Sequence, residues 1–376
     1  MERIPLDQIR RIRIWEHGKE EGLLHGLNEK NKKISLLDLA SNDYLSLSTN
    51  PKLVEAANLA MISQGVGAGG SRFITGSRPI HKKLENALGE WLNREHVLLF
   101  PSGFQANLAA VIALANRNTL ILADKLIHHS LLVGIHASGA KFKRFAHNDL
   151  NELQKYLTLS HGQKVLVITE SLFSMQGTSP DLEKVCLLCK KYNANLLVDE
   201  AHALGVMGYQ GRGLCYGLSD QVSLISGTFG KAFGSGGAFL ASNKFIGEDL
   251  VQKSGAFRYT TALAPPLAAA ALEALKIIQQ NPSWGEELQL EAKRWRNQIN
   301  TQGWDYPPGE GPIISIVIGS NKQSLAYQKK LEQNGLLCVA IRPPTVPEGT
   351  SRLRIVVRRN LPKNTLQKLT SSLAKQ

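Results

Sequence analysis

The chain has 376 residues and a formal net charge of +13, with 43% hydrophobic and 20% charged residues. This length suffices for a large core and for two or more domains. No apolar run reaches the ~20 residues that a membrane-spanning helix needs, and the first residues lack the apolar stretch of a secretion signal. Four cysteines in so long a chain are not a disulfide framework. We therefore expect a cytoplasmic globular protein.

The positive charge is compatible with nucleic acid, an anionic membrane or an acidic small molecule as partner. Lysines and arginines are spread along the chain, and their small clusters, such as Lys141–Arg144, accompany no nucleic-acid-binding motif. A solvated basic surface is the simplest interpretation, and attraction of an anionic cofactor and a thioester is the second. We expect neither nucleic acid nor a membrane as partner.

The predicted elements begin with a helix and a short strand in residues 1–45, followed by a helical stretch from Pro51 to Gln64. From about residue 97, short apolar runs alternate with segments of helical length. The predicted strands are His96–Phe100, Thr119–Ala123, Lys164–Glu170, Asn195–Glu200, Gln221–Thr228 and Gly236–Ala241. The helices between them are predicted at Gln105–Asn116, His129–Ser138, Leu150–Leu159 and Leu182–Tyr192.

These strands are continuously apolar rather than alternating, which is typical of parallel strands covered on both faces. Right-handed crossovers then give an α/β fold with a mostly parallel, doubly wound sheet. After Ala264-Pro265-Pro266, two helices and a mixture of short strands and helices indicate a smaller α+β domain. The predicted division is an N-terminal segment at 1–45, a large domain at 46–265 and a small domain at 266–376.

Two segments carry the chemistry. The first, Leu197–His202, is a buried strand that delivers Asp199 and His202 at its carboxyl end. The second, Ser226–Lys231, presents one lysine in a glycine-rich turn. A lysine so held can bond covalently to an aldehyde, and an aspartate at a neighbouring strand end can keep a pyridine nitrogen protonated. Together they predict pyridoxal phosphate as cofactor; a mid-sheet ion pair with an exposed lysine is the alternative.

Polar residues follow three further predicted strands. Ser102 and Gly103 open a helix whose backbone N–H groups suit a phosphate, although an ordinary helix start would read the same. His128 follows the next strand and suits stacking on a ring, although a lone histidine is more often a surface or cap residue. Glu170 and Ser174 follow another strand, where an ordinary polar loop is the alternative. Because ligands of open α/β sheets bind outside the carboxyl ends of the strands, we expect one site there.

Two other motifs match known binding patterns but are not expected to bind a dinucleotide or a metal. Gly65–Gly70 satisfies the dinucleotide pattern G-x-G-x-x-G, but a helix precedes it where a strand is required, so a nicotinamide site is not expected. Cys186 and Cys189 have metal-ligand spacing without a second pair or a histidine partner. Core cysteines are the favoured interpretation, and we expect no metal.

The chain resembles the α-oxoamine synthases of the fold-type-I pyridoxal-phosphate enzymes over nearly its whole length. Matching stretches are Ala40–Leu45, Pro101–Phe104, Thr169–Met175, Val198–His202 and Gly227–Lys231. The resemblance implies that Lys231 bonds to the cofactor and that Asp199 pairs with its pyridine nitrogen. The remaining implied contacts are the ring hydroxyl for His202 and Ser174, ring stacking for His128, and the phosphate for Gly103, Phe104 and Thr228.

The resemblance also implies a homodimer with shared active sites, in which Thr260 or Thr261 reaches the phosphate of the partner subunit. Asn42, Arg342 and Arg352 are implied at the substrate, and Glu170 braces the site. The segment Ala340–Arg354 is similar to the biotin-pathway branch of the family, which condenses L-alanine with a pimeloyl thioester of coenzyme A or of acyl carrier protein. The alternatives are another α-oxoamine synthase that uses glycine or serine, a non-catalytic scaffold subunit, and a basic nucleic-acid binder.

Overall fold

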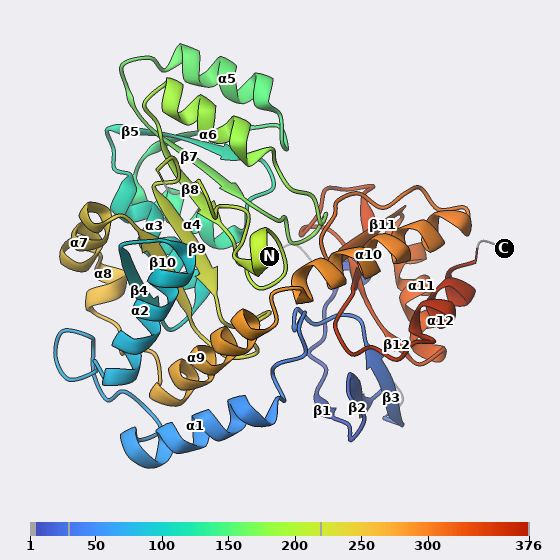
Figure 1. The fold of residues 1–376 in the computed structure, drawn as a ribbon. Coiled ribbons are helices and arrows are strands. Elements are labelled where there is room, and N and C mark those ends of the chain that lie inside the picture. Colours follow the sequence, from blue (N-terminus) through green and yellow to red (C-terminus); the bar gives the residue numbers. More distant parts are fainter. Residues whose placement is uncertain (1–4, 29–30, 219, 375–376) are drawn as a thin grey trace. The chain divides into compact units, whose positions relative to one another are not determined.

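The computed structural model describes residues 5–28, 31–218 and 220–374, so residues 1–4, 29–30, 219 and 375–376 lie outside the described residues. The described chain forms two compact units (Figure 1). The first takes the residues up to Ser46, the short segment Ser174–Thr178 and the residues from Glu287 onward. The second takes Leu47–Phe173 and Ser179–Glu286. The division at residues 45 and 265 stays a prediction about domains.

The larger unit is built on a seven-stranded sheet with the order β4-β10-β9-β8-β7-β5-β6 in the described part of the chain. Neighbours from β9 to β6 are parallel, whereas β10 is antiparallel to both β4 and β9. The predicted, mostly parallel α/β sheet is thereby confirmed. The strands are β4 (His96–Phe100), β5 (Thr119–Asp124), β6 (Lys141–Phe145), β7 (Lys164–Glu170), β8 (Asn195–Asp199), β9 (Leu224–Thr228) and β10 (Ala238–Ser242).

Helices cover this sheet and enclose an apolar core. α3 packs against α4, α7 and α8 and against β8, β9 and β10, while α6 packs on β8 beside α5. Core residues include Phe100 and Phe173, both fully buried. The helices are α1 (Pro51–Gln64), α2 (Pro79–Leu92), α3 (Gly103–Leu114), α4 (His129–Ser138), α5 (Leu150–Leu159), α6 (Leu182–Lys191), α7 (Lys244–Lys253), α8 (Gly255–Arg258) and α9 (Pro265–Gln280), with a short 3-10 helix η2 (Tyr209–Gly211).

The smaller unit contains two sheets, with the orders β1-β2-β3-β12 and β11-β14-β13. Its strands are β1 (Trp15–His17), β2 (Leu23–Leu27), β3 (Lys33–Asp38), β11 (Ile313–Gly319), β12 (Leu336–Leu337), β13 (Val339–Ile341) and β14 (Ser351–Val356). Its helices are α10 (Trp284–Thr301), which begins in the larger unit, α11 (Asn321–Gln333), α12 (Thr365–Leu373) and the 3-10 helix η1 (Leu6–Gln8).

The prediction of an α-helix in residues 1–45 is wrong for the described residues there. They form a 3-10 turn and the three strands β1, β2 and β3. Gly26 permits the close approach within this hairpin, because a Cβ on it would lie 2.6 Å from the Trp15 ring. Partner strands, which local periodicity does not report, therefore decide the structure of this segment.

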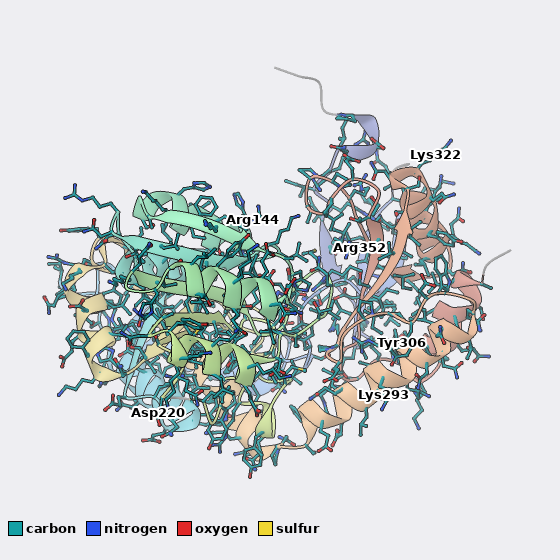
Figure 2. The ribbon with its side chains drawn as sticks, turned by 90° about the horizontal axis from the view of Figure 1, so that it is seen from above. Arg144, Asp220, Lys293, Tyr306, Lys322 and Arg352 are labelled. Atoms are coloured by element: carbon teal, nitrogen blue, oxygen red, sulfur yellow. The ribbon has the colours of Figure 1, made fainter. Side chains whose placement is uncertain are left out.

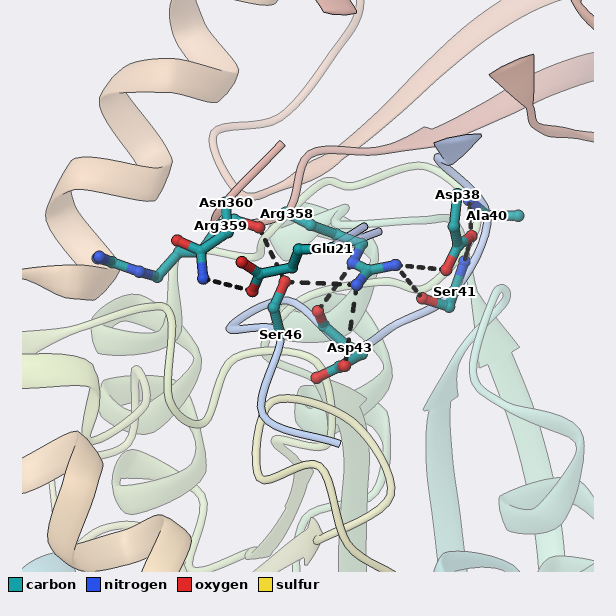
Figure 3. Close-up of polar contacts among 9 residues, drawn as sticks. All are labelled: Glu21, Asp38, Ala40, Ser41, Asp43, Ser46, Arg358, Arg359 and Asn360. Carbon is teal, nitrogen blue, oxygen red and sulfur yellow. Dashed lines mark hydrogen bonds and ion pairs between the residues drawn. The ribbon is translucent and has the colours of Figure 1, made fainter. Parts of the chain in front are cut away.

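Arg358 joins the two ends of the chain in the smaller unit (Figure 3). Its Nη1 donates to Asp38 Oδ2 in a buried ion pair and to Ser41 Oγ at 3.2 Å. Its Nη2 donates to Ser46 Oγ at 3.3 Å, and its Nε donates to the Asp43 carbonyl at 3.1 Å. This guanidinium thus fixes the segment from Asp38 to Ser46, which includes Asn42.

No helix in the described part of the chain combines the length and the apolar character that crossing a membrane requires.

Candidate active site

Four neighbouring parallel strands, β5, β7, β8 and β9, end at the same edge of the large sheet. Glu170, the last residue of β7, lies directly beside Asp199, the last residue of β8. Asp199 is paired in turn with Ser226 of β9, two residues before the strand ends at Thr228. The topology therefore brings the polar strand ends together.

Asp199 is held by donors on both of its carboxylate oxygens. Its Oδ1 accepts from the Ala201 backbone N–H at 2.9 Å, and its Oδ2 accepts from Asn107 Nδ2 at 2.7 Å. The side chain is buried, with 6% exposed. A carboxylate oriented in this way is suited to pair with a protonated ring nitrogen. His202, three residues further on, is also buried.

Lys231 lies in a tight loop between β9 and β10. The Lys231 carbonyl accepts from the Gly234 N–H, and the Phe229 carbonyl accepts from the Ser235 N–H, both at 2.9 Å. Lys231 is half-buried, and its positive charge lowers the pKa of both His128 and Glu170. The amine is therefore an electrostatic neighbour of the groups that follow β5 and end β7.

His128 is exposed and forms the N-cap of α4. Partial desolvation of the imidazole lowers the pKa of His128, and the positive charges of Lys231 and His129 lower it further. The negative charge of Asp199 opposes this shift. A neutral imidazole at the mouth of the strand-end cluster is the species expected near pH 7, and it is suited to stacking on a ring.

Glu170 is the acid of the cluster that burial affects most. With 3% of the residue exposed, burial raises its pKa well above the ordinary value, and the neighbouring Asp199 charge raises it further. The backbone N–H of His128 donates to this carboxyl group, while its buried Oε1 has no protein partner. Burial and the Asp199 charge thus both favour the neutral form of this acid, which lies beside Asp199.

The start of α3 lies beside Thr228. A Cβ on Gly103 would lie 3.8 Å from Thr228 Oγ1, so the helix N-terminus and this hydroxyl are adjacent. Ser102 Oγ caps the helix by accepting from Gln105 N at 3.3 Å, and Phe104 is exposed. Thr228 Oγ1 accepts from Gly230 N at 3.2 Å. The Thr228 hydroxyl itself donates to the Gly237 carbonyl at 3.0 Å, so the donors available to a phosphate here are the N–H groups at the start of the helix.

The predicted substrate residues belong to the smaller unit, and a further arginine lies among them. Arg354 Nη2 donates to Asn42 Oδ1 at 2.8 Å, and its Nε donates to the Ser174 carbonyl at 2.6 Å. Arg354 is not among the site residues predicted from the sequence. Its spacing from Arg352, which places both on one face of β14, was the available signal.

Arg352 and Arg342 have different surroundings. Arg352, on β14, is buried (Figure 2). Two other basic residues labelled in the same view, Lys293 of α10 and Lys322 of α11, are exposed. Arg352 Nε donates to the Thr350 carbonyl at 3.0 Å, and burial lowers its pKa. Arg342 Nη1 donates to the Asp7 carbonyl at 2.5 Å.

Thr260 and Thr261 lie next to the glycine-rich loop. Thr261 forms an isolated bridge with Ser71, and the Ala262 N–H donates to the Gly70 carbonyl at 3.0 Å. Gly65 ends α1, so the G-x-G-x-x-G run follows a helix, as the sequence analysis noted. This loop is therefore held against the Thr260 segment rather than between a strand and a helix.

The cysteine pair behaves as core. Cys186 and Cys189 are buried free thiols on α6, and burial raises the pKa of Cys186 to about 11. A thiol in such surroundings is a poor ligand at neutral pH. Within residues 5–28, 31–218 and 220–374, no group of three or more His, Cys, Asp or Glu side chains could hold a metal ion.

The strand-end cluster fits pyridoxal phosphate. Lys231 could provide an amine for the aldehyde, Asp199 a fixed carboxylate for the pyridine nitrogen, and the start of α3, beside Thr228, N–H donors for the phosphate. The buried Glu170 Oε1 and Asn107 Oδ1 lack protein partners in the same region, which indicates a polar site rather than a closed apolar core.

A model of the aminotransferase class I and II family matches residues 34–373. The chain belongs to this family. The 8-amino-7-oxononanoate synthase of Alkalilimnicola ehrlichii is 40% identical over 320 residues, which are 84% of this chain and 82% of that protein.

Solved structures of two enzymes are similar to this chain over most of its length. The serine palmitoyltransferase of Sphingomonas wittichii is 27% identical and has a TM-score of 0.90, covering 96% of this chain and 91% of its own. A further serine palmitoyltransferase structure, which is 26% identical and also has a TM-score of 0.90, contains pyridoxal phosphate. The 8-amino-7-oxononanoate synthase of Francisella tularensis is 28% identical, with a TM-score of 0.79 and coverage of 90% and 97%. The chain is thus an α-oxoamine synthase and a pyridoxal-phosphate enzyme of the aminotransferase class I and II family, which confirms the predicted family, fold and cofactor.

Proposed function

We propose that the enzyme condenses L-alanine with a pimeloyl thioester to give 8-amino-7-oxononanoate, carbon dioxide and the free thiol, a step of biotin biosynthesis. The cluster of Lys231, His128, Glu170 and Asp199 at neighbouring strand ends supports the cofactor chemistry. The substrates rest on the names of relatives that are about 40% identical and on the similarity of Ala340–Arg354 to the biotin-pathway branch.

When bound, pyridoxal phosphate supplies an electron sink for the electron pair left at the amino acid Cα. In the proposed roles, the Lys231 amine holds the cofactor aldehyde, and, once the amino acid has taken its place, its Nζ accepts the Cα proton. Asp199 accepts a hydrogen bond from the pyridine nitrogen and keeps it protonated. His202 and Ser174 contact the ring hydroxyl, and His128 stacks on the ring.

The remaining proposed roles concern binding. The N–H groups of Gly103 and Phe104 and the Thr228 hydroxyl hold the phosphate. Arg352 binds the amino acid carboxylate through a charge-assisted fork, with Asn42 and Arg342 also at the substrate. Arg354 is a second candidate for the carboxylate, because it contacts both Asn42 and Ser174. The new carbon–carbon bond joins the alanine Cα to the acyl carbon as the thiol leaves. The alanine carboxylate then departs as carbon dioxide, and Cα takes up a proton in its place.

A homodimer is part of the proposal, with Thr260 or Thr261 reaching the partner subunit's phosphate. Exposed apolar side chains occur on α1 and the loop after it, and they include Ile62, Val66 and Ile74; where such side chains form a contiguous patch, they mark an interaction surface. The four buried free cysteines suit the reducing cytoplasm.

The test supplies L-alanine, glycine or L-serine with pimeloyl, succinyl, acetyl or palmitoyl coenzyme A and measures carbon dioxide and thiol release. We expect alanine and the pimeloyl donor to give the highest kcat/KM, and pimeloyl acyl carrier protein is then compared with the coenzyme A thioester. The Lys231→Ala variant is the inactive control. Preference for serine and the palmitoyl donor would instead identify an activity like that of the serine palmitoyltransferases, whose backbone matches at a TM-score of 0.90.

A further inference from the structure

A buried polar bridge between α3 and α4 links Asp199 to His128. It consists of Asn107, with 2% of the residue exposed, and Ser130, with none exposed. Asn107 Nδ2 donates to Asp199 Oδ2 at 2.7 Å and to Ser130 Oγ at 2.9 Å. Ser130 Oγ lies 2.7 Å from His128 Nδ1. One continuous set of hydrogen bonds therefore runs from the carboxylate to the imidazole.

The carboxylate determines how the amide is oriented. A carboxylate only accepts hydrogen bonds, so the atom that faces Asp199 is the Asn107 nitrogen and not its oxygen. That nitrogen has two N–H groups, one for Asp199 and one for Ser130. The Asn107 oxygen, which has no protein partner, is left pointing elsewhere. The Ser130 oxygen consequently accepts from Asn107, and its own hydrogen is free to be donated onward.

The tautomer of His128 follows from the same geometry. The Ser130 backbone N–H donates to His128 Nδ1 at 3.3 Å, so Nδ1 has an available lone pair and no hydrogen. The Ser130 hydroxyl, 2.7 Å from the same nitrogen, then donates to it as well. A neutral imidazole with an acceptor at Nδ1 has its hydrogen on Nε2.

We propose that Asn107 and Ser130 are positioning residues that orient the Asp199 carboxylate and hold His128 as a neutral imidazole with its hydrogen on Nε2. The inference rests on the proposed function, in which Asp199 and His128 both face the cofactor. A cationic ring at His128 would compete with the protonated pyridine nitrogen for the Asp199 charge. The bridge prevents this competition by occupying Nδ1 with two donors.

The charges around His128 act in both directions. Asp199 favours the imidazolium, whereas partial burial, Lys231 and His129 disfavour it. The carboxyl group of Glu170 receives the His128 backbone N–H rather than a ring hydrogen. Because α4 begins after His128, its N-terminal partial charge also disfavours a cation there. The bridge therefore adds to a local field that already opposes protonation.

The experiment records ¹⁵N NMR spectra of the imidazole groups in the cofactor-free protein during a pH titration, with His128→Gln to identify the signal. In the unsubstituted protein we expect the Nε2–H tautomer and a low titration midpoint. In Ser130→Ala, loss of one donor should mix the tautomers and raise the midpoint by roughly 0.5–1 pH unit. Ser138→Ala is the matched control, because Ser138 lies on the same helix and its hydroxyl bonds only locally among the described residues, donating to the Ile135 carbonyl at 2.7 Å and accepting from Ala140 N at 3.2 Å.

Asn107→Leu, which keeps the size of the side chain, should weaken pyridoxal phosphate binding roughly tenfold. A His128 that has its hydrogen on Nδ1, or that titrates identically with and without the Ser130 hydroxyl, would overturn the inference. If Asn107→Leu does not fold, Ser130→Ala decides alone. If the unsubstituted protein binds no pyridoxal phosphate, the proposed function fails, while the NMR result still decides whether the bridge fixes His128.

Discussion

Arg354 and Asn42 are joined by a hydrogen bond of 2.8 Å although 312 positions separate them in the sequence. The same guanidinium donates to the Ser174 carbonyl, so it connects three segments of one unit. Asn42 and Ser174 are both proposed site residues. Arg354 therefore competes with Arg352 for the role of binding the substrate carboxylate.

We expect Arg354→Lys to raise the KM for the amino acid by roughly 10–100-fold, since a lysine cannot replace charge-assisted hydrogen bonds made from two nitrogens. Steady-state kinetics with alanine as the varied substrate measure this. Arg294→Lys, at an exposed arginine of α10 that pairs with Glu291, is the control. If Arg352→Lys raises the KM and Arg354→Lys does not, Arg352 alone binds the carboxylate.

Lys231→Ala should abolish turnover and the covalent attachment of the cofactor. After borohydride treatment, mass spectrometry should find pyridoxal phosphate fixed to Lys231 in the unsubstituted protein and to no residue in the variant. Lys244→Ala, at an exposed lysine that begins α7, should behave as the unsubstituted protein. Fixation at another lysine would remove Lys231 from its proposed role.

Asp199→Asn should leave the protein folded and remove most activity, because a neutral amide does not keep a pyridine nitrogen protonated. An amide also turns an NH₂ group toward either Asn107 or the Ala201 N–H, which are both donors. His202→Ala should lower kcat only roughly 2–10-fold, the effect of one hydrogen bond. Equal losses in the two variants would contradict this division of roles.

Glu200 should make the stability of the larger unit depend on pH. Burial raises the pKa of its carboxyl group from 4.5 to about 7. Because the folded state binds the proton more tightly, the stabilisation from this group is fully present below pH 4.5 and is lost as the pH rises through about 7. Glu200→Gln keeps an oxygen that accepts from Leu214 N and Cys215 N. In this variant the denaturation midpoint should depend less on pH between these two values. If the midpoint changes with pH as steeply as in the unsubstituted protein, Glu200 is not the group responsible.

Arg358→Met should destabilise the smaller unit by about 3–5 kcal/mol, because it leaves the Asp38 carboxylate buried without its partner. Hydrogen exchange in β3 and β14 should report the loss, and exchange in β7 and β8 should not change. Adding Asp38→Asn to the variant should recover part of the protection, since the buried charge is then gone. If Asp38→Asn restores no protection from exchange, the loss of stability comes from lost packing of the Arg358 side chain and not from the unpaired Asp38 carboxylate.

Much of the fold and of the cofactor site could be predicted because the signals are local. Apolar runs followed by polar residues locate β5, β7, β8 and β9, and parallel crossovers then bring their ends together. The direction of β10 could not be read, because a strand buried on both faces is apolar whichever way it runs. β6 was missed, since its exposed residues, Lys141 to Arg144, have none of the usual apolar character of a strand.

The remaining features of the fold and of the site could not be predicted, because they depend on contacts between residues that are far apart in the sequence. The parallel pairing of β3 with β12 joins Leu37 to Leu336, and no local pattern in residues 33–38 indicates such a partner. Arg354 gained significance only through its contacts with Asn42 and Ser174. Asn107 carried a signal that was not used, because it is a polar residue in the middle of the apolar run that forms α3.

The assembly of the smaller unit from both ends of the chain bears on how the protein is made. As the chain leaves the ribosome, the residues up to Ser46 emerge well before β12 and Arg358, their partners in the finished structure. The larger unit can complete most of its sheet as soon as β10 has emerged. One edge of β3 therefore stays unpaired until β12, about 300 residues further along the chain, has been synthesised. That interval is when the nascent chain is most exposed to aggregation and most in need of a chaperone.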